Sequence, residues 1–250
     1  MRHLFIVFAV AIASAGSAGT VLGADRVKSE SRGGLTAESE LPPFDRVAVQ
    51  GFTDVTLVQG NAEGLALDGG SAEDLRGLSL DVTDGMLTIT NPHTRRWWVD
   101  FMGEGKPARI TLTYKKLNGL TVEGAATVRA ERLVTDRLSV SASGATSVRI
   151  GGLETNDLTV TGSGALKLEV AGRTVSQKIR ISGAGDYQAG KLDSQTAAVS
   201  VSGAGKVVVR AQKTLDVSVS GAGSVEYFGD PKVTQDIRGI GSIQRRGGAD

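Results

Sequence analysis

Residues capable of catalysis or metal binding are scarce in this sequence. There is no cysteine, and the two histidines are His3 and His93. Thiol catalysis and metal sites built from several histidines are therefore excluded. Paired carboxylates remain, because two acids that flank a glycosidic bond can cleave it. Asp186 and Glu226 each closely follow a Gly-x-Gly motif, and further acids occur at Asp193, Asp216, Asp230 and Asp236.

These acids do not repeat at equivalent positions of the chain. The positions equivalent to Asp186 in neighbouring copies of the motif are Lys206 and Ser224. We interpret the acids as solvated surface charges and predict no catalytic residue. The alternative is a periplasmic polysaccharide-active enzyme of β-helical fold, which would require two carboxylates about 5 to 9.5 Å apart in a groove.

The Gly-x-Gly motifs could be mistaken for phosphate-binding loops. A dinucleotide-binding loop needs a strand, then Gly-x-Gly-x-x-Gly, and then a helix whose N-terminus faces the phosphates. Here a strand pattern follows every motif, and the repeat occurs in seven copies, of which the first two carry Ala126 and Thr146 in place of the second glycine. We therefore expect no nucleotide, no other cofactor and no metal.

The densest candidate binding cluster is Arg95, Arg96, Trp97 and Trp98, within the segment 91–106. Tryptophan stacks on sugars and lies at membrane interfaces, and arginine binds carboxylate or phosphate through two parallel hydrogen bonds. One interpretation is a ligand-contact tip. The other is a plug in which the segment folds back over the end of the repeats.

An internal repeat must position these residues. The first small residue of each copy falls at glycines separated by 20, 18, 21, 20, 18 and 18 residues, which are Gly124, Gly144, Gly162, Gly183, Gly203, Gly221 and Gly239. Apolar residues alternate with polar ones through each copy, which is the pattern of a β-strand. The glycines share the apolar parity, so each lies where the inner wall has no room for a side chain or where the strand bends. The glycines that we assign to corners are Gly144, Gly162, Gly164, Gly183, Gly185, Gly203, Gly205, Gly221, Gly223, Gly239 and Gly241.

Hydroxyl side chains also recur before the first glycine of the motif. Ser182, Ser202 and Ser220 occupy this place, with Thr161 close by in kind. Such a ladder satisfies hydroxyl groups and favours strands. The alternative interpretation is a carbohydrate-binding strip.

The repeat predicts an all-β fold. A unit of about 20 residues is too short to bury its own apolar face, whereas parallel stacking of units buries it. We predict a parallel β-helix (β-solenoid) of about seven rungs of 18 to 21 residues with a β-rich N-terminal cap region. An antiparallel sandwich or a propeller is the alternative, but a propeller blade needs about 40 residues.

The chain divides into five predicted parts, which are a signal peptide (1–24), a flexible linker (25–43), an N-terminal β region (44–119), the repeats (120–245) and a tail (246–250). Within the N-terminal region we expect order to begin near Phe44 and a copy of the repeat to span 44–58. A helical turn is expected at 71–75, a hairpin around Asp84 and Gly85, and a strand over 108–114.

Charge and composition limit the location and the partners. The leader has a short basic start followed by about a dozen apolar residues, which is typical of export. Removal of its Arg2 leaves 27 basic and 27 acidic residues, so bulk charge does not favour nucleic acid. Export without cysteine favours the bacterial periplasm or cell surface. We expect a glycan or cell-envelope polymer as partner, and self-association through sheet edges.

Several motifs resemble a known family. They are Phe44-Asp45-Arg46-Val47 with Gln59-Gly60, the hairpin from Asp84 to Ile89, the three Ser-Gly-Ala-Gly motifs, and Gly229-Asp230-Pro231 with the stretch from Gly239 to Ile243. Together they resemble the bacterial family called putative auto-transporter adhesin, head GIN domain, over about residues 44–245. The resemblance implies an exported β-helical domain with an adhesive role. We therefore expect a non-catalytic cell-envelope or surface protein that presents a repetitive face.

Overall fold

The computed structural model describes residues 5–6, 36–68, 78–91 and 108–247. These residues form an all-β structure without a helix. The strands are β1 (Phe5–Ile6), β2 (Thr36–Glu40), β3 (Arg46–Gln59), β4 (Gly64–Asp68), β5 (Ser79–Thr83), β6 (Met86–Asn91), β7 (Ala108–Tyr114), β8 (Gly119–Ala130), β9 (Leu133–Val134), β10 (Arg137–Gly203), β11 (Lys206–Arg210), β12 (Thr214–Gly221), β13 (Ser224–Phe228), β14 (Lys232–Gly239) and β15 (Ser242–Arg245). They belong to one open sheet, whose strand order does not close on itself.

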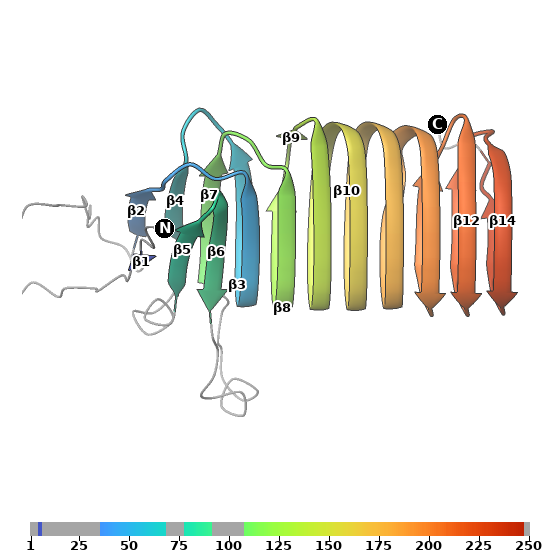
Figure 1. Cartoon of the computed structure of the whole chain (residues 1–250), viewed down its shortest axis with the longest axis horizontal. Coiled ribbons are helices and arrows are strands. Elements are labelled where there is room, and N and C mark those ends of the chain that lie inside the picture. Colours follow the sequence, from blue (N-terminus) through green and yellow to red (C-terminus); the bar gives the residue numbers. More distant parts are fainter. Residues whose placement is uncertain (1–4, 7–35, 69–77, 92–107, 248–250) are drawn as a thin grey trace, which may run out of the picture.

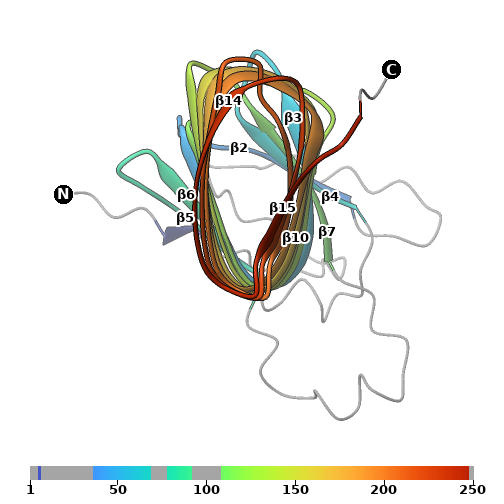
Figure 2. The same ribbon diagram turned by 90° about the vertical axis from the view of Figure 1, so that its right-hand side faces the viewer.

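Parallel pairing in register is the rule along most of this sheet. β8 pairs with β10, β10 with β11 and β12, and β12 with β14, so each segment lies beside the one about 18 to 20 residues later. β10 is a run of 67 residues that crosses the stack several times (Figure 1). Viewed end on, the successive layers superpose as a flattened ring (Figure 2).

The core fills the inside of this ring. Alternate residues of β12 are buried, namely Leu215, Val217 and Val219, while the residues between them face solvent. The buried side chains form one cluster from Leu41 to Val225. Leucine, isoleucine and valine dominate this cluster, so burial of aliphatic surface holds the layers together.

One glycine in each layer sits directly against its counterpart in the layer before. These stacking glycines are Gly51, Gly124, Gly144, Gly164, Gly183, Gly203, Gly221 and Gly239, and their φ angles lie between 92° and 127°. A Cβ atom added at any of them would lie 2.1 to 3.0 Å from backbone atoms of the preceding layer. Both the positive φ and the close backbone approach therefore require glycine.

The second glycine of the motif has a different role. Gly185, Gly205, Gly223 and Gly241 do not have positive φ. A Cβ at these positions would lie 2.6 to 3.0 Å from the side chains of Ile181, Val201 or Val219. The sequence offered two reasons for the glycines, a bend in the strand or a lack of space on the inner wall. In the structure the first glycine of the motif makes the bend, and the second lies where the inner wall has no room for a side chain.

The structure corrects the alignment of one repeat. Gly164, with φ 97°, stacks on Gly144, whereas Gly162 is buried two residues earlier against Leu166. The Gly-Ser-Gly sequence offered two candidates for the corner, and the sequence alignment took the wrong one. Thr161 therefore does not belong to the column of Ser182, and Ser163 takes that place.

The N-terminal region joins the same stack. β3 pairs in register with β8, and Gly51 aligns with Gly124, as predicted for a copy of the repeat. On its other side β3 pairs with β6 and β7, which together form the preceding layer. The antiparallel strands β2, β4 and β5 lie beyond that layer, at the N-terminal end of the stack (Figure 1).

Two local predictions for this region are confirmed and one is wrong. β5 and β6 form the hairpin, with positive φ at Asp84 and Gly85, and β7 spans 108–114. The linker predicted over 25–43 is wrong at its end, because β2 pairs with β4 before residue 44. The polar sequence of β2 shows no apolar alternation, so periodicity could not find it. The helical turn expected at 71–75 lies outside the described residues.

The stacking glycine predicts a difference between two substitutions in one layer. Gly203→Ala forces a Cβ to about 2.7 Å from the carbonyl oxygen of Gly183 at φ 124°. We expect this change to lower the free energy of unfolding by at least about 2 kcal/mol in urea denaturation.

Gly205→Ala is the matched control, because Gly205 has no positive φ and its Cβ would lie 3.0 Å from a Val201 methyl group and 3.3 Å from the nearest backbone atom, the Gly185 oxygen. We expect a clearly smaller loss for this change. Equal losses for the two variants would contradict the assigned difference between the two glycines.

Tyr114 predicts the response of the fold to alkaline pH. It is fully buried, and its hydroxyl group has no hydrogen-bond partner among the described residues. Burial raises the pKa of Tyr114 to about 12. An unfolded tyrosine loses its proton near pH 10, so the folded state holds one more proton between about pH 10 and 12.

The free energy of unfolding should therefore fall as the pH rises through this window. Tyr114→Phe should reduce the slope in urea denaturation series taken between about pH 9 and 11.5. An unchanged slope would show that the Tyr114 phenol does not titrate differently in the folded and unfolded states.

Candidate functional site

Residues that lie the same number of positions from the stacking glycine in the sequence form columns on the outer surface. Two columns before the glycine are rich in hydroxyl groups, and we call them the hydroxyl face. Ser200 pairs with Ser218, and Ser202 pairs with Ser220. The hydroxyl face comprises Thr121, Ser141, Thr161, Ser200 and Ser218 in one column and Ser143, Ser163, Ser182, Ser202 and Ser220 in the other.

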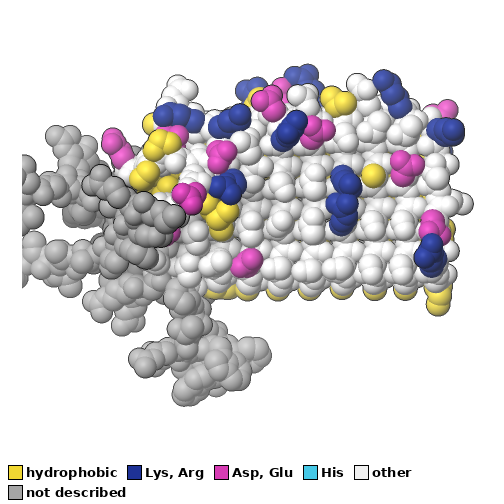
Figure 3. All heavy atoms as spheres, in the orientation of Figure 1, with side chains coloured by type: hydrophobic (Ala, Val, Ile, Leu, Met, Phe, Trp, Pro, Cys, Tyr) yellow, Lys and Arg dark blue, Asp and Glu magenta, His cyan; other side chains and the backbone are white. Residues whose placement is uncertain are grey.

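This face is flat and carries few charged side chains over the middle of the stack (Figure 3). The hydroxyl groups of Ser200, Ser202, Ser218 and Ser220 make no hydrogen bond to any described residue, and these side chains are exposed. Ser182 donates one long hydrogen bond, 3.4 Å, to the carbonyl oxygen of Gly162. The face therefore offers a regular array of hydroxyl groups with free hydrogen-bonding capacity, spaced about 4.8 Å along the stack.

A shallow hollow of about 400 Å³ lies in this face. Lys178 and Arg180 stand at one end, and Asp216 and Asp236 stand toward the other. Ser200 and Ser218 lie between them. A ligand in the hollow would meet hydroxyl groups in the centre and charges of opposite sign at the ends.

A line of small apolar side chains borders the hydroxyl face. The residue after each stacking glycine from Gly124 to Gly239 is exposed, and hydrophobic side chains follow the lower rim in Figure 3. These residues are Ala125, Ala145, Ala165, Ala184, Ala204 and Ala222, and the next position in the series is Ile240, which is 90% exposed. The rim places methyl groups beside the hydroxyl groups at the same spacing.

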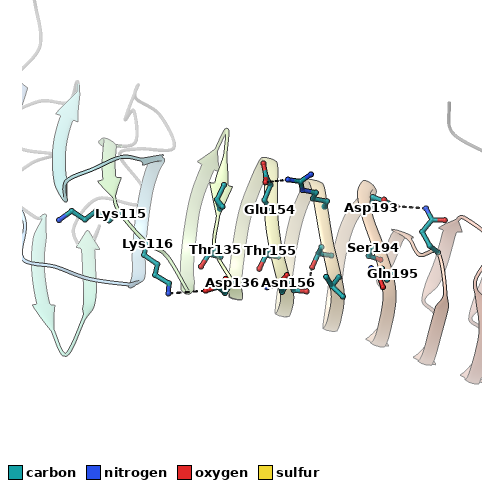
Figure 4. A pocket seen from close by; sticks show the side chains of 15 residues that line it. Lys115, Lys116, Thr135, Asp136, Glu154, Thr155, Asn156, Asp193, Ser194 and Gln195 are labelled. Atoms are coloured by element: carbon teal, nitrogen blue, oxygen red, sulfur yellow. Dashed lines mark hydrogen bonds and ion pairs between the residues drawn. The ribbon is translucent and has the colours of Figure 1, made fainter.

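A groove of about 720 Å³ runs across several layers at the opposite edge (Figure 4). Its floor is a column of buried hydroxyl residues, Thr135, Thr155, Thr174 and Ser194, and we call it the threonine groove. Each of the three threonines donates to the carbonyl oxygen two residues later, at 3.0 to 3.4 Å. These hydroxyl groups stabilise the turn of the chain and are already hydrogen-bonded.

The charges around the threonine groove are also paired. Arg173 binds Glu154 at 2.6 Å, and Arg132 binds the same carboxylate at 3.3 Å. The hydrogen bond from Arg173 and its charge lower the pKa of Glu154. Lys116 lies 4.0 Å from Asp136. The groove therefore has few polar groups left to bind a ligand.

A buried polar network supports the wall beside this groove. Gln177 is 1% exposed and occupies a core position that is leucine in several other layers. Its amide donates to the hydroxyl oxygen of Ser194 at 2.9 Å and to the carbonyl oxygen of Arg210 at 3.2 Å. Tyr187 donates to the Gln177 carbonyl oxygen at 3.3 Å. Burial raises the pKa of Tyr187, so its hydroxyl group keeps its proton.

Most of the candidate acids are paired with bases or amides, and Asp216 and Asp236 both line the hollow of the hydroxyl face. Asp186 stands beside Lys206 in the register and accepts a hydrogen bond from Gln188 at 2.5 Å. Glu226 contacts Lys206 at 3.4 Å and also pairs with Arg246, so its buried oxygen is not unpaired. Asp193 accepts from Gln212, Asp230 pairs with Arg245, Asp236 pairs with Arg238, and Asp216 lies in the hollow of the hydroxyl face.

Among the acids, the pKa values of Glu154 and Glu169 are lowered by neighbouring bases, Arg173 and Lys167 respectively. A general acid for glycoside cleavage needs a raised pKa instead. Within the described ranges, no group of three or more histidine, cysteine, aspartate or glutamate residues could hold a metal ion.

The predicted cluster of Arg95, Arg96, Trp97 and Trp98 lies outside the described residues. The described residues on either side of this segment are Asn91 and Ala108. Asn91 aligns with the stacking glycine Gly51, and Ala108 pairs with Thr53 two residues further on. Asn91 and Ala108 therefore both lie at the corner that the alanine rim occupies in later layers.

The sequence reasoning found one column of the hydroxyl face and missed the other. The missed column lies two residues earlier, and it includes Thr161, which had been assigned to the wrong column. A better marker was present in the sequence, because Gly-Ala occurs at every corner from Gly124 to Gly221. Alignment on this pair would have selected Gly164 and both columns.

These features define an all-β protein built from parallel strands in register, with a flat hydroxyl face. The chain belongs to the family described as putative auto-transporter adhesin, head GIN domain, whose sequence model matches residues 43–231. Among curated proteins, none is detectably similar to this chain.

Solved structures share the fold. A putative adhesin from Bacteroides fragilis is similar with a TM-score of 0.79 and 23% identity, over 86% of this chain and 98% of that one. A putative lipid binding protein from Parabacteroides distasonis is similar with a TM-score of 0.67 and 18% identity, over 86% and 97% of the two chains. A putative adhesin from Parabacteroides merdae has a TM-score of 0.64 and 18% identity, over 85% and 95%. No helix in the described ranges is long and apolar enough to span a membrane.

The buried network predicts non-additive effects of two substitutions. Gln177→Leu leaves the Tyr187 hydroxyl group without its acceptor, so we expect a loss of about 1 to 3 kcal/mol in the free energy of unfolding. Tyr187→Phe should cost about 1 kcal/mol. The double variant should cost less than the sum of the two, because neither change then leaves the other group unpaired. Additive losses in urea denaturation would contradict the network.

Proposed function

We propose that this chain is a non-catalytic exported protein of the bacterial cell envelope or surface, and that its hydroxyl face is an adhesive surface. In this proposal the stack is a β-solenoid of about seven rungs in the repeat region, and the six rungs with stacking glycines from Gly124 to Gly221 each add one or two hydroxyl residues to the same face. The observation that carries the proposal is the pair of exposed hydroxyl columns in register.

The chemistry of the face favours a glycan or a neutral cell-envelope polymer as ligand. Serine and threonine hydroxyl groups both donate and accept hydrogen bonds, as sugar hydroxyl groups do. The adjacent alanine rim can contact the apolar side of a sugar ring. A polymer with its own repeat can meet several rungs at once, so weak contacts add up.

The hydroxyl face supports this role better than the threonine groove does. The hydroxyl groups of the groove are hydrogen-bonded to backbone carbonyls, and Glu154 is held by two arginines. A ligand there would have to replace existing interactions. On the hydroxyl face, Ser202 and Ser220 would gain partners at no such cost.

Export in this proposal depends on the predicted signal peptide at 1–24, and the absence of catalysis depends on the pairing of most candidate acids with bases or amides. The family name and the neighbours described as adhesins agree with an adhesive role. One neighbour is described as a putative lipid binding protein. The polar character of the hydroxyl face favours a glycan over a lipid for this chain.

Two lysines on the hydroxyl face should block binding. We expect Ser182→Lys with Ser220→Lys to weaken binding to purified cell-envelope polysaccharides at least about tenfold on a glycan array, because hydrogen bonds are lost and flat contact is prevented. Both residues are exposed, so the free energy of unfolding should change by less than about 0.5 kcal/mol.

Gln195→Lys with Gln212→Lys is the matched control, since both residues are exposed beside the threonine groove. Binding that is lost in the control and kept in the serine variant would move the site to the groove. Arg96→Ala with Trp98→Ala tests the predicted contact at 95–98 in the same way. A protein that binds no polysaccharide in the screen would contradict the proposed ligand class.

A further inference from the structure

The C-terminal end of the stack has an open strand edge. β14 pairs with β12 on one side, and no described strand pairs with its other side. Its core-facing residues lack a following layer. Ile237 is 36% exposed, whereas Val219, its partner in β12, is 1% exposed. An edge with exposed apolar residues is a site for pairing with another strand.

The two ends of the stack differ. At the N-terminal end, the layer of β6 and β7 is bordered by antiparallel strands, including β4 and β5. A second copy therefore cannot continue the parallel pairing by docking its C-terminal edge on the N-terminal end. Two copies can still meet with their C-terminal edges facing each other, which requires antiparallel pairing about a two-fold axis.

The hydrogen bonds of β14 show which residues face the open side. The amide groups of Lys232 and Ile240 donate to carbonyl oxygens of the preceding layer, at 2.8 and 2.9 Å. Successive residues of a strand direct their backbone groups to opposite sides. The free amide and carbonyl groups of β14 are thus those of Val233, Gln235 and Ile237. An antiparallel partner strand must bond to these residues.

We propose that β14 pairs antiparallel with β14 of a second copy, centred on Ile237. Charge selects this register among the neighbouring ones. Centring on Ile237 places Asp236 of each copy opposite Arg238 of the other copy, which gives two acid–base pairs. Centring on Asp236 or on Arg238 would place like charges opposite each other, and centring on Gln235 would place Arg238 opposite Lys232.

The geometry of this register brings the charges close. Ile237 forms a hydrogen-bonded pair with Ile237 of the second copy. Asp236 and Arg238 therefore fall in the flanking non-hydrogen-bonded pairs. Directly opposite Cα atoms in such pairs are about 4.5 Å apart, and their side chains are the closest across the strands. Within one copy Arg238 already lies 3.0 Å from Asp236. The dimer would extend this pair into a two-by-two cluster in which every charge has neighbours of opposite sign along and across the strands, while the two Ile237 side chains would cover each other.

The dimer would also place two hydroxyl faces side by side. The two-fold axis passes through the centre of β14 from the front of the sheet to the back, so both copies present the same face on the same side. A repeating polymer could then contact both copies at once. The pairing itself does not depend on the proposed ligand, and its test uses no ligand.

Charge reversal tests the interface and its register together. We expect the purified full chain to be a dimer by sedimentation velocity. Asp236→Arg alone and Arg238→Asp alone should each weaken the dimer more than about tenfold, because each places like charges opposite each other. An equimolar mixture of the two variants should restore a dimer of one copy of each, in which every opposite pair is again an acid with a base.

Asp216→Arg is the control, since this exposed aspartate lies one layer away from the edge. It should leave the dimer intact. A monomeric wild-type chain at about 50 µM would overturn the proposal. A dimer that survives both single variants would place the interface elsewhere. Failure of the mixture to dimerise would overturn the Ile237 register. Circular dichroism of the variants excludes unfolding as the cause of any loss.

Discussion

The close contact between stacking glycines is the constraint on which the structure depends. At each corner the backbone of one layer lies directly on the backbone of the layer before, at a positive φ that a side chain would strain. The contact fixes the register, because a shift of one residue would bring a Cβ atom into it. A fixed register then makes every outer position a column. Both the hydroxyl face and the alanine rim follow from this single local requirement.

The sequence predicted the elements that depend on periodicity and turn chemistry. Alternation identified the repeat and its strands, and Asp84 with Gly85 identified the hairpin. Prediction from the sequence failed where apolar and polar residues do not alternate. β2 is polar and is recognised only through its pairing with β4. Gly162 was chosen over Gly164 because both glycines of Gly-Ser-Gly satisfy the motif, and only backbone stacking distinguishes them.

The candidate surfaces were predictable to different degrees. One hydroxyl column was visible in the sequence because the same residue type recurs beside the same motif. The threonine groove was not predicted, although its floor residues Thr135, Thr155, Thr174 and Ser194 recur every 19 or 20 residues, and three of them follow a leucine by two residues. The buried Gln177 also could not be assigned a role from sequence, since its partners Ser194 and Tyr187 become neighbours only when the layers stack.

Polar groups in this molecule divide into those that hold the stack together and those that remain available. At the edge of the threonine groove the chain bends, and the hydroxyl groups of Thr135, Thr155 and Thr174 donate to backbone carbonyl oxygens of the bend. On the hydroxyl face the backbone groups are already paired between layers, so the side-chain hydroxyl groups have no structural duty. The same residue types thus serve stability at one edge and are free on the flat face. This difference arises from the backbone acceptors within reach of each hydroxyl group, and it is why we propose the hydroxyl face, and not the threonine groove, as the surface for recognition.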